Sequence, residues 1–205
     1  MREARGNDIP LPKERVAAEL DLDSEWTNQA QKLANLFAKE LKLNPQEYIA
    51  GLPKFSPQPE TFRGRFDIPV IVETRIPLAR MLKLADIDCY FDSNEVKDWS
   101  KGNFKTPEKP YVAWVHDGAR NRGRSVEKVR KSLAPDERGG TVFEGITLYL
   151  REPKILESHF LDLPGSQVGS AHAPSLRLWV GRLGLGCSWV GGAPPGCASV
   201  SCGRT

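Results

Sequence analysis

Residues 165–204 read GSQVGSAHAPSLRLWVGRLGLGCSWVGGAPPGCASVSCGR, and this stretch sets the architecture expected for the second half of the chain. No Asp or Glu follows Asp162, and the last 43 residues hold nine of the 18 glycines but only three charged side chains. Trp179 and Trp189 lie among leucines, and flexible linkers avoid such residues. The stretch therefore predicts a packed layer with glycine-rich hairpins or loops.

The overall composition is typical of a globular protein. The chain has 205 residues, of which 40% are hydrophobic and 27% charged, so one domain can bury a core without disulfides. No apolar stretch is long enough for a membrane span. The N-terminal residues lack the apolar segment of a signal peptide, so we expect a cytoplasmic protein with reduced cysteines. A net charge of +3 does not by itself indicate nucleic-acid binding.

The first part of the chain has helical patterns. Apolar residues at spacings of four and three form one helix face, namely Trp26, Ala30, Leu33, Phe37 and Leu41. Ser24 is the expected N-cap of this helix, and Asn44 is expected to cap a second helix that ends at Gly51. Three prolines follow within residues 53–60. We therefore divide the chain into a helical region (1–52), a Pro-rich loop (53–60) and an α+β core (61–205).

Beyond the loop, short strands and short helices alternate. β-branched and aromatic runs predict strands at 69–73, 88–91, 111–116, 160–163 and 176–180. Helices are expected to begin at Pro77, Ser93, Ser125 and Thr141, with Val96 and Trp99 in the second of them. The predicted fold class is α+β, with N-terminal helices followed by a mixed sheet, short helices and a Gly-rich C-terminal hairpin or loop region.

Several motifs of the second half resemble those of a bacterial family. They are Tyr111-Val112 with Asp117-Gly118; Thr141, Glu144, Gly145, Ile146 and Leu148; Gly165, Ser166, Gly169, Pro174 and Leu176; and Trp189, Gly191, Ser199, Ser201, Cys202 and Gly203. Residues 111–204 resemble an uncharacterised domain family of unknown function that is common in actinomycetes. The chain departs from the pattern at Cys187, which lies one place off the family position. The resemblance implies a shared fold and no particular activity.

One candidate chemistry is nucleophilic catalysis by a thiol. Cys202 is the candidate nucleophile and His172 the candidate base, with His159 and His116 as alternative bases. The orienting carboxylate is expected from Asp86 or Asp88. A nearby cation would lower the pKa of such a thiol. The alternative is that Cys202 is a buried structural residue.

Two further groups of side chains are of the types that bind metal ions. His172, Cys187, Cys197 and Cys202 offer zinc ligands, but no C-x2-C knuckle is present and buried thiols explain them equally well, so we assign no metal ligand. An acidic cluster consists of Asp86, Asp88, Asp92 and Glu95. Paired carboxylates there suit Mg²⁺ or acid–base chemistry, whereas the alternative is solvated strand ends.

Positive charge and small residues mark two candidate binding segments. A basic segment holds Arg120, Arg122, Arg124, Lys128, Arg130 and Lys131, which suit a phosphate or a nucleic-acid backbone; the alternative is a solvated basic loop and helix face. The loop after residue 164 includes Ser166 and Gly169, whose backbone permits close approach of a ligand, but a tight structural turn is the favoured alternative. Trp179 and Trp189 are expected to form apolar walls.

These patterns favour a compact binding or interaction domain whose ligand, cofactor and partners are unknown. The alternatives are a small hydrolase-like enzyme using Cys202, a histidine and nearby acids, and an accessory protein that binds nucleic-acid backbone through Arg120–Lys131. No membrane partner is expected, and nucleic acid is the less favoured partner.

Overall fold

The computed structural model of the chain describes residues 20–204. The α-helices are α1 (Leu22–Phe37), α2 (Pro45–Ala50), α3 (Leu78–Leu84), α4 (Val126–Ser132), α5 (Val142–Arg151) and α6 (Ile155–Ser158). Three 3-10 helices are η1 (Glu60–Phe62), η2 (Ser93–Glu95) and η3 (Ala119–Asn121). The strands are β1 (Ile68–Val72), β2 (Asp88–Cys89), β3 (Val96–Asp98), β4 (Tyr111–His116), β5 (Glu137–Gly139), β6 (Phe160–Asp162), β7 (Ser166–Val168), β8 (His172–Trp179), β9 (Arg182–Trp189), β10 (Cys197–Ser199) and β11 (Ser201–Gly203).

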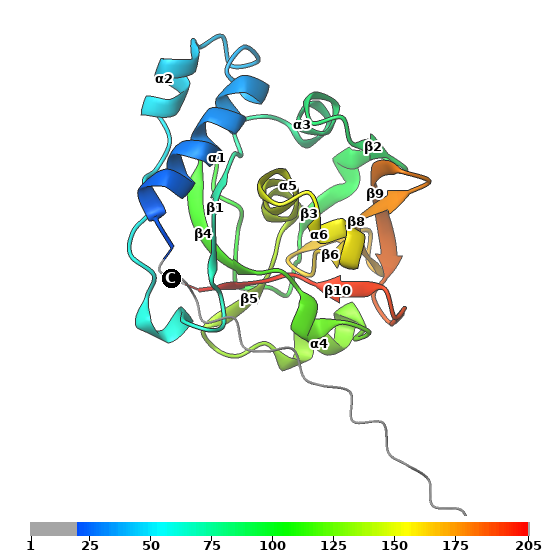
Figure 1. Cartoon of the computed structure of the whole chain (residues 1–205). Helices are drawn as coiled ribbons and strands as arrows, with labels where there is room; N and C mark the ends of the chain where they lie inside the picture. Colours follow the sequence, from blue (N-terminus) through cyan, green and yellow to red (C-terminus); the bar gives the residue numbers. More distant parts are fainter. Residues whose placement is uncertain (1–19, 205) are drawn as a thin grey trace, which may run out of the picture.

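The strands form two sheets, and the fold is α+β as predicted. The first sheet has the order β1-β4-β11-β5. The second has the order β10-β6-β8-β7-β3, and β9 adds to β8 and also pairs with β2. Helix α5 lies between the two sheets, while α1 runs beside the edge strand β1 (Figure 1). The short strands and helices therefore form layers around one central helix.

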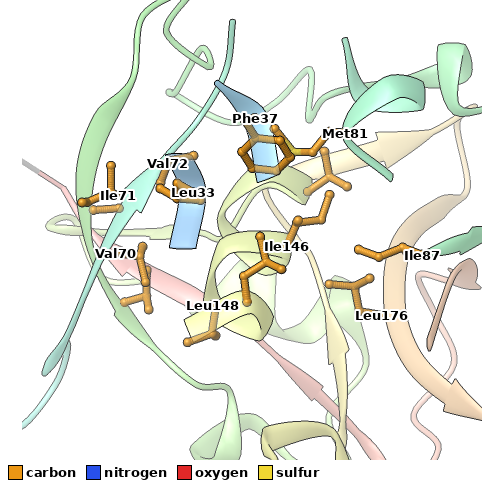
Figure 2. Close-up of a cluster of buried hydrophobic side chains, with 14 of the residues drawn as sticks. Leu33, Phe37, Val70, Ile71, Val72, Met81, Ile87, Ile146, Leu148 and Leu176 are labelled. Atoms are coloured by element: carbon orange, nitrogen blue, oxygen red, sulfur yellow. The ribbon is translucent and has the colours of Figure 1, made fainter. Parts of the chain in front are cut away.

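The hydrophobic core is built on α5. Ile146 and Leu148 of this helix are fully buried, and they lie between Val70 of β1 and Leu176 of β8 (Figure 2). Phe37 of α1 belongs to the same buried cluster, so the N-terminal helices and the two sheets share one core. Since α5 touches both sheets, its position fixes how they face one another.

The glycine-rich C-terminal stretch is integral to this fold. β11 lies between β4 and β5, where Cys202 pairs with Val115 on one side and with Arg138 on the other. β8 and β9 form an antiparallel hairpin joined by Val180 and Gly181, which have φ angles of 51° and 78°. The prediction that this stretch packs as structure, with a hairpin, is confirmed.

Helix α1 ends at Phe37, so Leu41 lies beyond the helix face on which the sequence places it. Two further local expectations from the sequence are wrong. Asp21, and not Ser24, caps α1, because the Asp21 carboxylate accepts the Ser24 N–H at 3.1 Å. The helix expected from Ser93 stops at Glu95, and the chain continues as strand β3. Pairing of β3 with β7 accounts for the difference at Ser93, since a strand partner overrides a weak local helix preference. In contrast, Asn44 and Thr141 begin α2 and α5 as predicted, and each forms a capping box.

Candidate functional site

A cavity of about 270 Å³ lies where α4, β5, the segment before β4 and the loop before β7 meet. We call it the arginine pocket and define it by the lining residues Trp99, Lys101, Phe104, Arg130, Arg138, Gly139, Gly165 and Arg204. These residues come from parts of the chain that are far apart in sequence. The tertiary structure therefore brings four basic side chains to one cavity.

Arg130 is the inner basic side chain of the pocket that has no carboxylate partner among the described residues. Its Nε donates to the Pro164 carbonyl at 2.9 Å and its Nη2 to the Ser166 carbonyl at 2.8 Å. The guanidinium carbon lies 4.6 Å from the centre of the Trp99 ring. Burial lowers the pKa of Arg130 to about 10, and no carboxylate of the described residues pairs with it. The side chain is therefore positioned by carbonyls and a ring, yet it keeps its charge at neutral pH.

Arg138 is held from the opposite side by a buried polar cluster. Its guanidinium bonds to both oxygens of Glu144, at 2.9 and 2.5 Å, and its carbon lies 3.6 Å from the centre of the Phe104 ring. Tyr111 and the backbone N–H of Thr141 also donate to Glu144, at 2.9 and 2.7 Å. Burial disfavours the ionised form of Glu144, but Arg138 outweighs it and lowers the pKa of Glu144. This cluster rigidly orients the wall of the pocket.

The floor of the pocket is backbone. A Cβ atom at Gly139 would lie 2.6 Å from the nitrogen of Gly165, so neither position accepts a side chain without displacement. The Gly165 N–H donates to the Gly140 carbonyl at 2.8 Å. Gly139 and Gly165 therefore contribute backbone, and no side chain, to the lining of the pocket.

The charge of the pocket is unbalanced. Lys101 and Arg204 are exposed at its mouth, in addition to the two inner arginines. Glu137 is the acidic lining residue, and it forms an ion pair with Arg120. Since Glu144 also pairs with Arg138, the cavity has more cationic than anionic groups and suits an anion.

The structure places Cys202 in surroundings unlike those of a reactive thiol. Cys202 is fully buried on β11, and its thiol donates to Glu144 Oε2 at 3.3 Å. Burial and the neighbouring carboxylate raise the pKa of the thiol well above its ordinary value. Activation of a nucleophilic cysteine requires a lowered pKa, so these surroundings are the reverse of what the hydrolase hypothesis needs.

The other predicted catalytic residues do not converge with Cys202. His172 and Asp88 belong to the second sheet, whereas Cys202 belongs to the first. On β9, His172 pairs with Trp189 and Asp88 with Gly184, and these two partners are five residues, or about 17 Å, apart along the strand. Asp88 pairs with Arg182 at 3.0 Å. Asp86 is exposed in a turn, with φ of 54°. The structure therefore assembles no thiol, imidazole and carboxylate group from these positions.

The predicted basic loop is largely engaged by the protein itself. Arg120 pairs with Glu137, and Arg122 donates to the Ser158 carbonyl at 2.5 Å. Arg124 donates to two neighbouring polar side chains at 3.0 and 2.7 Å. These side chains hold the loop against the rest of the fold, and Arg130 is the member of the basic segment that reaches the pocket.

The remaining predicted binding residues lie outside the pocket. Ser166 is buried, and its hydroxyl accepts the Val142 N–H at 2.9 Å, which helps to cap α5. Gly169 forms an open turn, with φ of 56°. Trp179 and Trp189 are 57% and 63% exposed at the ends of the hairpin strands.

Sequence reasoning missed Lys101, Phe104, Arg138 and Arg204 as members of one site. One signal was available, because residues 99–105 read WSKGNFK and interleave aromatic with basic residues. Nothing local indicated that this segment meets Arg130 and Arg138. That meeting depends on β5 and α4 lying beside it.

Comparison of the chain with protein-family models, curated proteins and solved structures finds no significant match. Within residues 20–204, no three His, Cys, Asp or Glu side chains are grouped as metal ligands. In the same part of the chain, no helix has both the length and the apolar character that crossing a membrane demands.

Proposed function

We propose that this protein is a binding domain for a small anionic ligand, with a phosphate group as the recognised chemistry. The observation that carries the proposal is the charged and oriented Arg130, which has two carbonyl partners and an aromatic support but no described carboxylate partner. This deepens the expectation of a binding domain of unknown ligand. The four free cysteines agree with a reducing cytoplasm as its place of action.

Electrostatics supports an anion over a neutral ligand. A unit anion about 4 Å from one guanidinium gains about 4 kcal/mol at an effective dielectric constant of about 20. Arg130 is already immobilised by its carbonyl bonds and by Trp99, so little side-chain entropy is lost when a ligand binds. Lys101 and Arg204 at the mouth add attraction that weakens with salt.

The size of the cavity favours a small ligand over a polymer. A volume of about 270 Å³ accommodates a phosphate group with a few attached atoms. A nucleic-acid backbone would use a longer row of free cations, whereas Arg120, Arg122 and Arg124 already bond to the protein. We therefore propose a small anion as the ligand, and the test below includes a nucleic acid as the competing ligand.

The test is isothermal titration calorimetry of the full chain with inorganic phosphate, a nucleoside monophosphate and a short single-stranded RNA. We expect saturable one-to-one binding of a small anion that weakens as salt rises. Arg130→Gln should weaken it at least about ten-fold, which corresponds to about 1.4 kcal/mol. Lys128→Ala is the matched control, because it removes one exposed cation from the same helix outside the pocket.

Two results would overturn the proposal. One is the absence of saturable binding by both small anions in folded protein at low salt. The other is equal weakening by Arg130→Gln and Lys128→Ala, which would indicate attraction to net charge only. Tight binding of RNA, without binding of either small anion, would show that the ligand is a nucleic-acid backbone.

A further inference from the structure

The arginine pocket is larger than the anion that its charge selects. Its volume is about 270 Å³, and a water molecule occupies about 30 Å³ in the liquid, so the cavity has room for about nine waters. A phosphate group fills the space of about three of them. The remaining volume is enough for an attached organic group of roughly the size of one ring.

The unpaired charge of the inner cavity lies at Arg130. Its described hydrogen bonds use Nε and one N–H of Nη2, which donate to the Pro164 and Ser166 carbonyls, so further N–H groups of the guanidinium remain for a ligand. Arg138, in contrast, donates to both carboxylate oxygens of Glu144 and is balanced by that charge. A phosphate is therefore expected at Arg130 and not at Arg138.

The chain between the two arginines supplies an apolar wall. Leu133, Ala134 and Pro135 line the cavity and connect the end of α4 to β5. Phe104 also lines it, with its ring against the balanced guanidinium of Arg138. Leu133, Ala134 and Phe104 are half-buried, so part of their apolar surface is accessible to a ligand. The cavity therefore has an apolar, electrically balanced part in addition to the charged part at Arg130.

The lining offers few partners for ligand hydroxyl groups. Asn103 is the one neutral amide or hydroxyl side chain among the described lining residues, and it is exposed. The backbone of Gly165 is engaged, since its N–H donates to the Gly140 carbonyl and its carbonyl accepts the Trp99 N–H, both at 2.8 Å. A buried hydroxyl without a hydrogen bond is costly, so a group with several hydroxyls fits this cavity poorly.

We infer that the arginine pocket binds a phosphate monoester whose organic group is a small apolar or aromatic ring, in preference to a sugar phosphate. The inference rests on the proposed recognition of phosphate and adds the class of the organic group. A monoester carries a charge of about −1.5 to −2 at neutral pH, which suits Arg130 together with Lys101 and Arg204 at the mouth. The ring then lies against Leu133 and Phe104.

The test is isothermal titration calorimetry of the full chain with inorganic phosphate, glycerol phosphate and phenyl phosphate at about pH 8. The second phosphate ionisation has a pKa of about 6, so the two monoesters carry the same charge at this pH. Arg130 is still charged there, because its pKa is about 10. We expect phenyl phosphate to bind at least about ten-fold more tightly than glycerol phosphate, because its ring buries apolar surface.

Leu133→Ala tests the apolar wall separately from the charge. This variant should lose most of the preference for phenyl phosphate over glycerol phosphate and keep the affinity for inorganic phosphate, since Arg130 is unchanged. Leu84→Ala is the matched control, because Leu84 is also half-buried at the end of a helix but lies outside the pocket. The control should keep both the preference and the affinity.

The outcomes separate the inference from the proposed function. Equal affinities for the two monoesters, or tighter binding of glycerol phosphate, would overturn the inference and leave phosphate recognition intact. The same conclusion follows if folded Leu133→Ala keeps the full preference for phenyl phosphate. If Leu133→Ala does not fold, the comparison of the two monoesters on the unaltered chain decides. Absence of binding by all three anions would overturn the proposed function and the inference with it.

Discussion

The side-chain amide of Gln29 bonds to Ile71 as a neighbouring strand would. The Gln29 Oε1 accepts the Ile71 N–H at 3.0 Å, and its Nε2 donates to the Pro69 carbonyl at 2.8 Å. β1 is the edge strand of the first sheet, so these groups face away from β4. A helix side chain thus satisfies the exposed edge of a strand and joins α1 to the sheet that α5 packs against.

Gln29→Ala should therefore destabilise the fold strongly for a single polar residue. The Ile71 N–H and the Pro69 carbonyl would lose their partners in a buried position, at a cost of about 1–3 kcal/mol each. Urea unfolding followed by circular dichroism measures the change. Gln31→Ala is the control, because Gln31 lies on the same helix and bonds only to exposed Asn35. Equal midpoints for the two variants would contradict the edge-pairing role.

The hairpin turn between β8 and β9 offers a stabilising substitution. Val180 has φ of 51° and is 93% exposed, and a β-branched residue is strained in this region of backbone space. Two successive positive φ angles match the turn that favours Asn-Gly. Val180→Asn should raise the free energy of unfolding by about 1 kcal/mol.

Gly181→Ala tests the same turn in the opposite direction. Gly181 has φ of 78° and no atom within 4 Å of a built Cβ, so only backbone strain opposes the alanine. Thermal unfolding should give a lower midpoint for Gly181→Ala and a higher one for Val180→Asn. Backbone strain does not control the stability of this turn if the two substitutions shift the midpoint in the same direction.

The order of cysteine modification should follow burial. Cys89 is exposed, whereas Cys202 is fully buried with a raised pKa. Mass spectrometry after limited iodoacetamide treatment should find Cys89 alkylated in the folded protein and Cys202 alkylated only after unfolding. Rapid alkylation of Cys202 in folded protein would revive the hydrolase hypothesis.

Substitution of Glu144, which forms a buried ion pair, should strongly lower the stability of the protein. Glu144→Gln leaves the Arg138 charge without its bidentate partner in a buried position. Loss of one partner of such a pair costs about 3–5 kcal/mol. Chemical denaturation should show this loss near neutral pH, and a fully stable variant would exclude an essential ion pair.

Asp162 should make the protein less stable as pH rises. Burial raises the pKa of Asp162 above its ordinary value of 3.8, although Ser175, Ser188 and Cys197 counteract part of the shift. A folded acid with a raised pKa holds its proton more tightly than the unfolded chain does. Its penalty is therefore absent below pH 3.8 and grows as pH rises toward the folded pKa.

Asp162→Asn removes this titration. The variant should be more stable than the wild type at neutral pH and similar to it below pH 3.8, as measured by denaturant unfolding at both conditions. The difference between the two proteins isolates Asp162 from other carboxylates, including Glu144, whose pKa is lowered. A stability difference that does not vary with pH would show that Asp162 is ionised equally in both states.

Local signals in the sequence predicted five of the six α-helices of the described residues, but only five of their eleven strands. The cap residues Asn44, Ser125 and Thr141 begin helices as expected, and the strand at 111–116 has the predicted bounds. Such signals succeed because caps, turns and periodicity act over a few residues. Ser93 is the instructive exception, since pairing of β3 with distant β7 decided its segment.

The sequence by itself determined that this chain forms an α+β fold whose carboxylate-free C-terminal stretch packs as structure, because tryptophans and leucines with few charges are typical of packed structure and not of a linker. Only the tertiary structure decided where charge and polar groups gather. Trp99, Arg130 and Arg138 meet at one cavity, and Asp162, Ser175 and Ser199 meet in one row, because strand pairing joins segments far apart in the chain. Tertiary packing decides which distant segments pair, so the local pattern of either segment does not reveal its partner.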